Sequence, residues 1–404
     1  MKASKKYQFI IQLGKALHTY GVPSYKIQTY LTNVSKIQGI KGSFMDLPTW
    51  INYVFYEENG KQTYNHIECV PPGNLNLGAL SRVSDLTRKV TSKEIKISEV
   101  APELDLIQKE TKKVNHFILT LSYALASGAF SLMIGTNWIS LMFALVFGAL
   151  VYFFVFLASK SSYISTVLES LASFVVTILA GLLVLVIPEF NVGLTVLSSI
   201  IIFVPGLALT TALEEITSKS LVSGSAKLFD ALISLFKQFF GVVLGVSLLS
   251  VLINIQLINH ISSIPKWVML IAVPLFSISL LPIFQVRKKD MLLGVITGIS
   301  GFSLTVLFSS FGILISTFVG TIIVVILSNL FSRFSNSPKT VFLTQGIIML
   351  VPGSKSFMGL SNVFLKSTIV NATNIYEQVA YILMGIIGGL LFAGVFRSTN
   401  SINE

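Results

Sequence analysis

Cysteine and histidine are scarce in this chain of 404 residues. The single cysteine, Cys69, excludes an intramolecular disulfide and a cysteine-based metal cluster. The four histidines lie far apart in the sequence, which favours structural roles over a metal site; they are His18, His66, His116 and His260. A phosphate-binding loop of the Walker type is also absent, which argues against work driven by ATP. We therefore expect neither a metal nor a cofactor.

Charged residues are few, and they are unevenly distributed. They make up 12% of the chain, against roughly 25% in an average soluble domain, while 53% of the residues are hydrophobic and the mean hydropathy is +0.78. Residues 1–113 hold 16 of the 29 Lys and Arg and 10 of the 18 Asp and Glu. The sequence thus predicts a polar N-terminal region followed by a polytopic membrane region. We attribute the net charge of +11 to membrane orientation and not to nucleic-acid binding.

The N-terminal region, residues 1–113, has the pattern of a small α+β domain. Its first residues lack the apolar core of a signal peptide, so we expect it to stay in the cytoplasm. No catalytic set of residues is evident from spacing. A regulatory or docking domain is therefore favoured, with a hydrolase as the alternative. The pattern predicts helices over 7–19, 25–37, 77–92 and 97–113, and strands over 49–56 and 62–70 joined through Asn59-Gly60.

Ten apolar spans follow, each able to reach the ~20 residues that cross a bilayer. Lys and Arg fall mainly in loops on one side of these spans, nine against three, which places both chain ends in the cytoplasm. We expect a multi-pass protein of the plasma or inner membrane. The predicted spans are 115–134, 139–158, 166–188, 192–211, 229–253, 267–286, 291–308, 312–332, 340–359 and 375–396.

An interrupted apolar segment occurs twice, at Pro205-Gly206 and again at Pro352-Gly353. The two glycines are 147 positions apart (353 − 206). A Pro-Gly pair breaks a helix and frees backbone groups that hydrocarbon cannot satisfy, so protein or a wet cavity must surround them. Broken helices in matching positions of two repeats are typical of the binding site of a secondary transporter.

The repeat predicts the architecture of the membrane region. Residues 114–256 and 257–404 each contain five predicted spans. Because five is odd, tandem units must have opposite orientations in the membrane, which is an inverted repeat. The predicted fold is therefore an all-α polytopic membrane protein with ten transmembrane helices in two inverted five-helix repeats, preceded by a small α+β cytoplasmic domain. Homo-oligomers remain possible.

Hydroxyl and amide side chains cluster around both breaks. Such groups suit a small polar solute with an amine, a carboxylate and a hydroxyl, although they serve equally well as interhelical hydrogen bonds. Lys355 is a candidate to hold a carboxylate, with an ordinary loop lysine as the alternative. The predicted binding residues are Ser199, Pro205, Gly206, Thr210, Gln345, Pro352, Gly353 and Lys355.

Charges inside spans are costly, so each is a candidate for function. Glu169 lies near the start of the third span, where the alternative is an interfacial acid capped by Lys160. Acids and a lysine also follow the first break, where a solvated loop is the alternative. Lys237 in the fifth span can extend to the membrane surface or pair with an acid inside the bundle, and we favour the first. The candidates for proton relay or gating are Glu169, Glu214, Glu215, Lys227, Asp230, Asn329 and Glu377.

Several segments together resemble the threonine/serine exporter family, which includes fungal pheromone-regulated membrane proteins. The most specific block is 205–228: Pro205-Gly206, then Glu214-Glu215, then Ser220-Leu221-Val222-Ser223-Gly224, then Lys227, where many members carry arginine. Shorter similar segments are Leu17-His18-Thr19-Tyr20-Gly21-Val22-Pro23-Ser24, Asn74-Leu75-Asn76-Leu77-Gly78, Val167-Leu168-Glu169 and Ile326-Leu327-Ser328-Asn329.

The resemblance implies ten spans, a cytoplasmic N-terminal domain and export of small hydroxy amino acids such as threonine and serine, coupled to the proton-motive force. Composition and spacing indicate only the membrane repeat and its broken helices. Three alternatives stay open: a passive channel or facilitator for small polar solutes, a hydrolase in the N-terminal region, and a regulator that transports nothing.

The repeat offset also generates a prediction about proton coupling. At 147 positions, Asp230 falls on Glu377, and inversion would place one acid at each mouth of the transport path. We expect Asp230→Asn and Glu377→Gln each to reduce the proton-coupled part of the flux, measured with and without a pH gradient. Unchanged coupling in both variants would remove this hypothesis.

Overall fold

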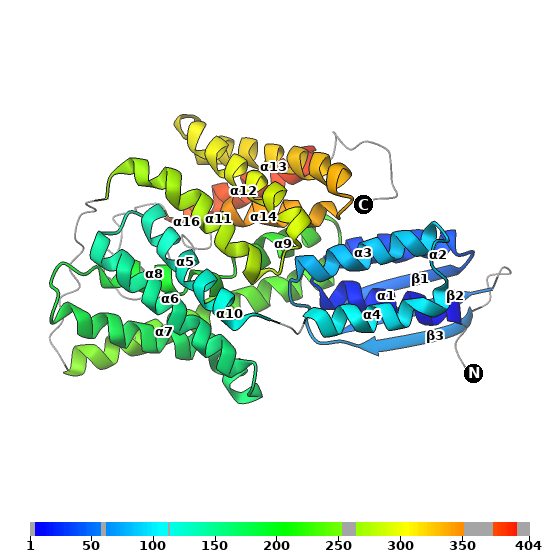
Figure 1. The fold of residues 1–404 in the computed structure, drawn as a ribbon, viewed down its shortest axis with the longest axis horizontal. Coiled ribbons are helices and arrows are strands. Elements are labelled where there is room, and N and C mark those ends of the chain that lie inside the picture. Colours follow the sequence, from blue (N-terminus) through cyan, green and yellow to red (C-terminus); the bar gives the residue numbers. More distant parts are fainter. Residues whose placement is uncertain (1–4, 58–61, 112–113, 253–263, 351–374, 394–404) are drawn as a thin grey trace.

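The computed structural model describes residues 5–57, 62–111, 114–252, 264–350 and 375–393. Most of these residues are helical, and one small sheet lies at one end of the molecule (Figure 1). The sheet and the first four helices form a layer beside a bundle of longer, more apolar helices.

The N-terminal layer confirms the predicted α+β character. Three strands pair in antiparallel order β1-β2-β3, and helices cover one face of the sheet (Figure 1). Both predicted strands and all four predicted helices are present. The elements are α1 (Lys5–Thr19), α2 (Ser24–Ile37), β1 (Lys41–Leu47), β2 (Trp50–Tyr56), β3 (Gln62–Cys69), α3 (Leu77–Thr91) and α4 (Ile97–Thr111). The predicted turn at Asn59-Gly60 lies outside the described residues.

Strand β1 was not predicted, because Lys41–Leu47 is short of apolar residues. It forms because β2 supplies a strong template: Ile51, Tyr53 and Phe55 alternate toward the core and are fully buried. On the helix side, Phe9 and Leu13 of α1 belong to the same core. The apolar face of α1 therefore fixes which face of the sheet is inside.

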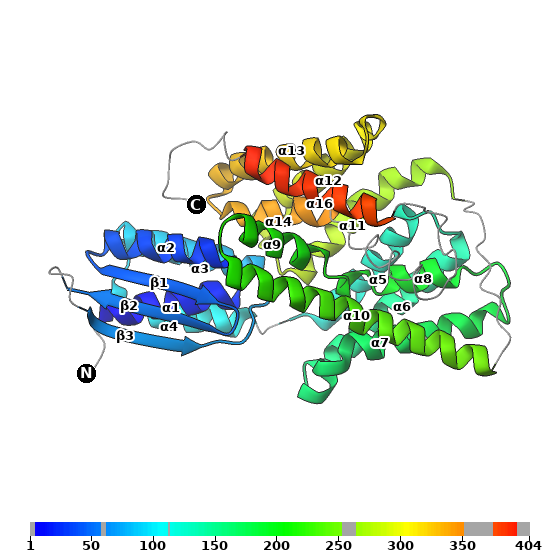
Figure 2. The same cartoon turned by 180° about the vertical axis from the view of Figure 1, so that it is seen from behind.

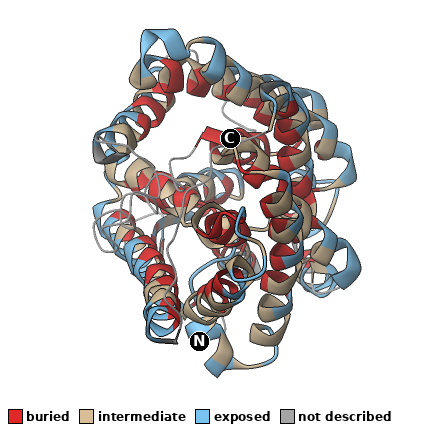
Figure 3. Cartoon of the chain, turned by 90° about the vertical axis from the view of Figure 1, so that its left-hand side faces the viewer, coloured by how far each residue is buried: buried red, intermediate tan, exposed pale blue. Residues whose placement is uncertain are grey.

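The bundle helices turn buried faces toward one another and exposed faces outward (Figure 3). Large apolar side chains such as Met142, Leu270 and Leu292 are exposed there, as expected of surfaces that contact lipid. The helices are α5 (His116–Met133), α6 (Trp138–Ala158), α7 (Ser162–Val184), α8 (Val192–Ser199), α9 (Gly206–Thr217), α10 (Leu221–Leu252), α11 (Met269–Ile283), α12 (Lys288–Leu307), α13 (Ile313–Ser335), α14 (Lys339–Leu350) and α16 (Ile375–Ala393).

The prediction of ten spans is met only in part. Within the described ranges, six helices are long and apolar enough to cross a membrane, and the bent pair α8–α9 makes a seventh. Helix α11 coincides with a predicted span but is shorter, with 15 residues. The described parts of α14 and α16 fall within two further predicted spans. The residues after Leu350, including Pro352, Gly353 and Lys355, lie outside the described residues, so the second break is not tested.

The first break is confirmed. Helix α8 ends at Ser199, a short 3-10 turn covers Ile201–Phe203, and α9 begins at Gly206. The two helical parts are bent by 54°. Pro205 has no amide hydrogen to donate, and Val204 is extended (ψ 116°), so the helical hydrogen-bond ladder stops there.

The third and fifth helices of each half pack in the same way. Gly241 and Gly245 of α10 lie against α7, and Gly385 and Gly389 of α16 lie against α13. The second pair of glycines follows the first by 144 positions (385 − 241, 389 − 245). A Cβ at any of these glycines would crowd the neighbouring helix, so the small residue is what permits the close approach.

The N-terminal layer contacts both halves of the bundle. The start of α2 touches α9 and α10, whereas α3 touches the turn between α11 and α12 (Figure 2). At the second contact, the Leu77 amide donates to the Phe284 carbonyl at 3.0 Å, and Asn76 Nδ2 donates to Gln285 Oε1 at 2.9 Å. A Cβ at Gly78 would collide with the Gln285 carbonyl oxygen.

This close approach predicts the effect of a side chain at position 78. We expect Gly78→Val to destabilise the docked arrangement by about 1–3 kcal/mol, because the backbone at Gln285 must move. Thermal unfolding of the full chain and hydrogen exchange in α3 would measure the loss. Lys89→Ala, an exposed position on the same helix, serves as the control. Equal stability of Gly78→Val and wild type would contradict the proposed contact.

Candidate functional site

Backbone groups freed by the break between α8 and α9 are satisfied by side chains of neighbouring helices. Ser127 Oγ of α5 donates to the Ser199 carbonyl at 3.2 Å, and Gln238 Nε2 of α10 donates to the Phe203 carbonyl at 2.8 Å. Ser127 and Gln238 are fully buried. The break is therefore maintained by protein, as hydrocarbon requires, and sequence reasoning had singled out neither residue.

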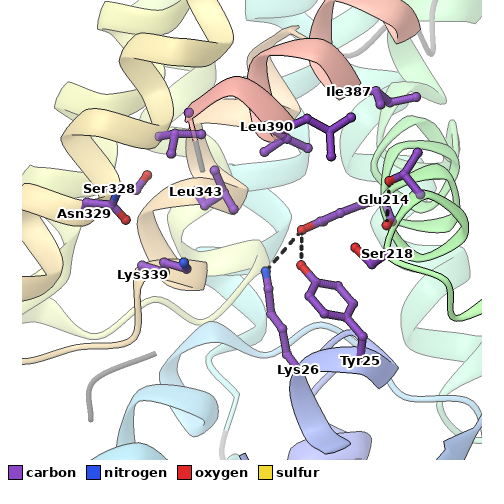
Figure 4. Close-up of a pocket in the computed structure, with 14 residues that line it drawn as sticks. Tyr25, Lys26, Glu214, Ser218, Ser328, Asn329, Lys339, Leu343, Ile387 and Leu390 are labelled. Carbon is purple, nitrogen blue, oxygen red and sulfur yellow. Dashed lines mark hydrogen bonds and ion pairs between the residues drawn. The ribbon is translucent and has the colours of Figure 1, made fainter. Parts of the chain in front are cut away.

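A cavity opens where α2 of the N-terminal layer meets the bundle (Figure 4). Its volume is about 190 Å³, and we call it the vestibule. A smaller cavity of about 40 Å³ shares Lys26, Glu214, Leu343 and Leu390 with it and extends to Leu207, Thr210 and Thr344. The vestibule is lined by Tyr25, Lys26, Glu214, Thr217, Ser218, Val325, Ser328, Asn329, Lys339, Leu343, Ile387, Leu390, Leu391 and Ala393.

Glu214 is the centre of the polar contacts in the vestibule. The Tyr25 hydroxyl donates to Glu214 Oε1 at 2.5 Å, and Lys26 Nζ lies 3.3 Å from the same oxygen (Figure 4). Burial favours the neutral amine of Lys26, but the Glu214 carboxylate and Tyr25 outweigh it, so the pKa of Lys26 is raised. Burial also raises the pKa of Tyr25. Lys26 thus stays charged and Tyr25 neutral across the physiological pH range.

The neighbouring acid of α9, Glu215, is fully buried. Its Oε1 accepts from the Ser24 amide at 2.7 Å and from Lys227 Nζ at 2.5 Å. The hydroxyls of Ser24 and Ser223 lie 2.6 Å apart. Glu214 and Glu215 are therefore not a solvated loop: both hold the beginning of α2 against the first half of the bundle.

The other predicted gating residues are scattered. Glu169 of α7 pairs with Lys237 of α10 at 3.8 Å, which is the second of the two roles considered for Lys237. Asp230 and Glu377 are both exposed. Asn329 lines the vestibule. Helix α10 starts at Leu221, which places Lys227 and Asp230 inside the helix and not at its opening.

The described binding candidates make local hydrogen bonds or none. Thr210 Oγ1 donates to the Gly206 carbonyl at 3.0 Å, and Ser199 Oγ donates to the Thr195 carbonyl at 2.7 Å. Thr210 also lines the smaller cavity. Gln345 is fully buried, and its amide has no hydrogen-bond partner among the residues that the structure describes. Pro352, Gly353 and Lys355 lie outside those residues.

Sequence reasoning missed a buried acid, Asp290, in the first turn of α12. Its Oδ1 accepts from Ser337 Oγ at 2.8 Å, and its Oδ2 accepts from Ser81 Oγ of the N-terminal layer at 3.2 Å. The predicted span began at 291, one residue later, so Asp290 looked like part of a basic loop. Glu169 was selected because it is an acid near the start of a span, and the same criterion would have selected Asp290.

Most of the sequence matches models of one protein family. Residues 8–249 match a model described as putative threonine/serine exporter, and residues 269–396 match a second, described as threonine/serine exporter, ThrE. Pheromone-regulated membrane protein 10 of Eremothecium gossypii is 26% identical over 382 residues, which cover 92% of this chain and 51% of that protein. The Saccharomyces cerevisiae protein of the same name is also 26% identical, covering 91% of this chain and 49% of its own length.

The chain spans about half the length of the curated relatives it matches. No solved structure is a significant match. The apolar helices and the internally satisfied break define a multi-pass membrane protein. The chain belongs to the threonine/serine exporter family.

The capping of the break predicts the effect of removing Gln238. Gln238→Leu keeps much of the side-chain volume but removes the donor to the Phe203 carbonyl, which should cost about 1–3 kcal/mol. We expect a lower thermal unfolding temperature in detergent. Ser250→Ala, at an exposed position of the same helix, should change little. If both variants unfold at the wild-type temperature, Gln238 does not stabilise the break.

Proposed function

We propose that this protein is a secondary transporter that exports threonine, serine or close hydroxy amino acids and is driven by the proton-motive force. The family supports the transporter class. The observation that carries the proposal is the continuity of the vestibule with the broken helix. The two cavities share Lys26 and Glu214, and the smaller one reaches Thr210, one turn beyond Gly206.

The groups in this path suit a small zwitterion. Glu214 offers a carboxylate to an ammonium group, and Lys26 and Lys339 bring positive charge to the same wall. Ser218, Ser328 and Asn329 add neutral donors and acceptors. A cavity of about 190 Å³ fits a small solute better than a drug-sized one, since pockets for the latter have volumes of ~300–1,000 Å³.

The proposed mechanism is alternating access between two inverted five-helix repeats, 114–256 and 257–404, behind a cytoplasmic domain of residues 1–113. The shared glycine packing of α10 on α7 and of α16 on α13 supports the repeat. Pro205-Gly206 and Pro352-Gly353 would meet in the central site together with Ser199, Gln345 and Lys355. Broken-helix backbone would then hold the substrate's charged groups.

Two features support a cytoplasmic position for the N-terminal layer. Arg287 and Lys289 pair with Asp85 of α3 at 2.6 and 3.6 Å, so these cations lie on the side of that layer. Lys339 lies at the vestibule beside Lys26. Positive charges gather on the cytoplasmic side of membrane proteins. In this orientation the vestibule is the inner mouth, and Glu169, Asp230 and Glu377 remain candidates for the proton relay.

Reconstitution tests the proposal directly. Proteoliposomes loaded with labelled threonine, serine and other amino acids should show efflux that a proton gradient accelerates. Glu214→Gln should lower kcat/KM by about tenfold, or ~1.4 kcal/mol, because the vestibule loses its carboxylate. Glu110→Gln removes an exposed surface acid paired with Arg82 and should have no effect.

The possible outcomes separate the alternatives. Flux that only follows the solute gradient, with no response to protons, would indicate a passive facilitator. Absence of flux in the wild type would leave a regulator or a hydrolase. Wild-type flux in Glu214→Gln would show that the vestibule is not on the substrate's path.

A further inference from the structure

Three polar atoms are buried in the second half of the bundle without a partner among the described residues. They are Nε2 and Oε1 of Gln345 on α14 and Oγ of Ser277 on α11. Neither side chain has any exposed surface. An unpaired buried polar group loses its hydrogen bonds to water without replacement, and nearly all buried polar groups in proteins are paired. Three such atoms on two contacting helices therefore require an explanation.

Glycines of α12 make the space in which these groups lie. A Cβ at Gly298 would sit 2.9 Å from Ser277 Oγ and 3.3 Å from the Gln345 carbonyl oxygen. A Cβ at Gly294, one turn earlier, would sit 3.3 Å from Cγ of Gln345. Helices α11, α12 and α14 thus bring a hydroxyl and a carboxamide to one glycine-lined face, next to the Met349 side chain.

The first half of the bundle also packs a serine against a glycine of the next helix, but there the serine hydroxyl has a hydrogen-bond partner. A Cβ at Gly148 of α6 would sit 2.5 Å from Ser127 Oγ, and that hydroxyl donates to the Ser199 carbonyl of the broken helix. Ser277 and Gly298 each follow their counterparts by 150 positions (277 − 127, 298 − 148). The shared architecture therefore does not require an unpaired serine. The second half differs in leaving its serine, and Gln345 beside it, without partners.

We infer that Gln345 and Ser277 form the subsite that binds the side-chain hydroxyl of the transported amino acid. This inference rests on the proposed function. A carboxamide offers N–H donors and an acceptor oxygen, and a serine hydroxyl is both donor and acceptor; a substrate hydroxyl can therefore accept from one of these residues and donate its single hydrogen to the other. The groups that meet there are neutral, so an ammonium or a carboxylate would be buried without its counter-charge, at far greater cost.

Helix α14 connects this subsite to the vestibule. Thr344 lines the smaller cavity, and Gln345, the next residue, faces α12. Because Gln345 is fully enclosed in this structure, the subsite becomes accessible only when α14 moves against α12. Such a movement is what alternating access demands of a helix that precedes a Pro-Gly break.

Threonine and L-2-aminobutyrate give a direct test, since they share a carbon skeleton and differ only in the hydroxyl. In proteoliposomes containing the full chain, wild type should prefer threonine. Ser277→Ala and Gln345→Leu should each lower the ratio of kcat/KM for threonine to that for L-2-aminobutyrate by about tenfold. Ser250→Ala, at an exposed position of α10, should leave this ratio unchanged.

The unfolding temperature without substrate provides a second readout. If Ser277 had only a structural role, its replacement would lower this temperature, whereas a binding role predicts no fall. Ser127→Ala should lower the unfolding temperature because the Ser199 carbonyl loses its donor. Ser277→Ala should leave the temperature unchanged or raise it, since it removes an unpaired hydroxyl. A fall equal to that of Ser127→Ala would overturn the inference in favour of a structural hydrogen bond.

The remaining outcomes show whether the subsite inference fails alone or together with the proposed transport function. A wild type that transports threonine and L-2-aminobutyrate equally well, or unchanged ratios in both variants, would overturn the subsite and leave the transport function standing. A wild type that transports neither solute would overturn the proposed function and, with it, the subsite.

Discussion

The constraint on which this structure depends is that hydrocarbon cannot hydrogen-bond a broken helix. The interruption at Pro205-Gly206 exists only because other helices supply the missing donors, Ser127 from α5 and Gln238 from α10. Those two helices are fixed in turn by close packing: α5 lies on α6, where Gly148 admits Ser127, and α10 lies on α7 through Gly241 and Gly245. The glycine contacts and the break are thus parts of one arrangement, and losing either would expose backbone groups to lipid.

The N-terminal layer adds a second constraint by contacting both halves of the bundle. Its α2 holds Glu214 and Glu215 of the first half, and its α3 holds Asp290 and the Phe284–Gln285 turn of the second. A layer that bridges two halves limits how far they can move relative to each other. The vestibule lies at one of these contacts, so access to the broken helix and the docking of the layer depend on the same side chains.

The sequence was informative where a pattern has a local physical cause. Period-two apolar alternation predicted β2, helical periodicity predicted α1 to α4, and Pro-Gly in an apolar run predicted the bend between α8 and α9. The sequence was uninformative where a structural feature depends on a residue far away in the chain. Strand β1 forms on the template of β2, Asp290 is buried by Ser81 and Ser337, and Lys26 gains its role from Glu214, 188 positions later (214 − 26). No periodicity encodes such pairings.

The two contacts of the N-terminal layer differ in what separating them would cost. At α2 the contacts are an ion pair, a tyrosine hydroxyl, serine hydroxyls and the Ser24 amide bonded to Glu215, all groups that water can solvate once the contact opens. The Lys26–Glu214 pair is already partly exposed, 18% and 17%. At α3 the Leu77 amide is bonded to a backbone carbonyl, Gly78 lies directly on Gln285, and Leu77 packs with Phe342 in an apolar cluster. Opening that second contact would expose the apolar surface of this cluster as well as a backbone amide. The lower-cost separation is therefore at α2, beside the vestibule, with α3 remaining attached to the second half.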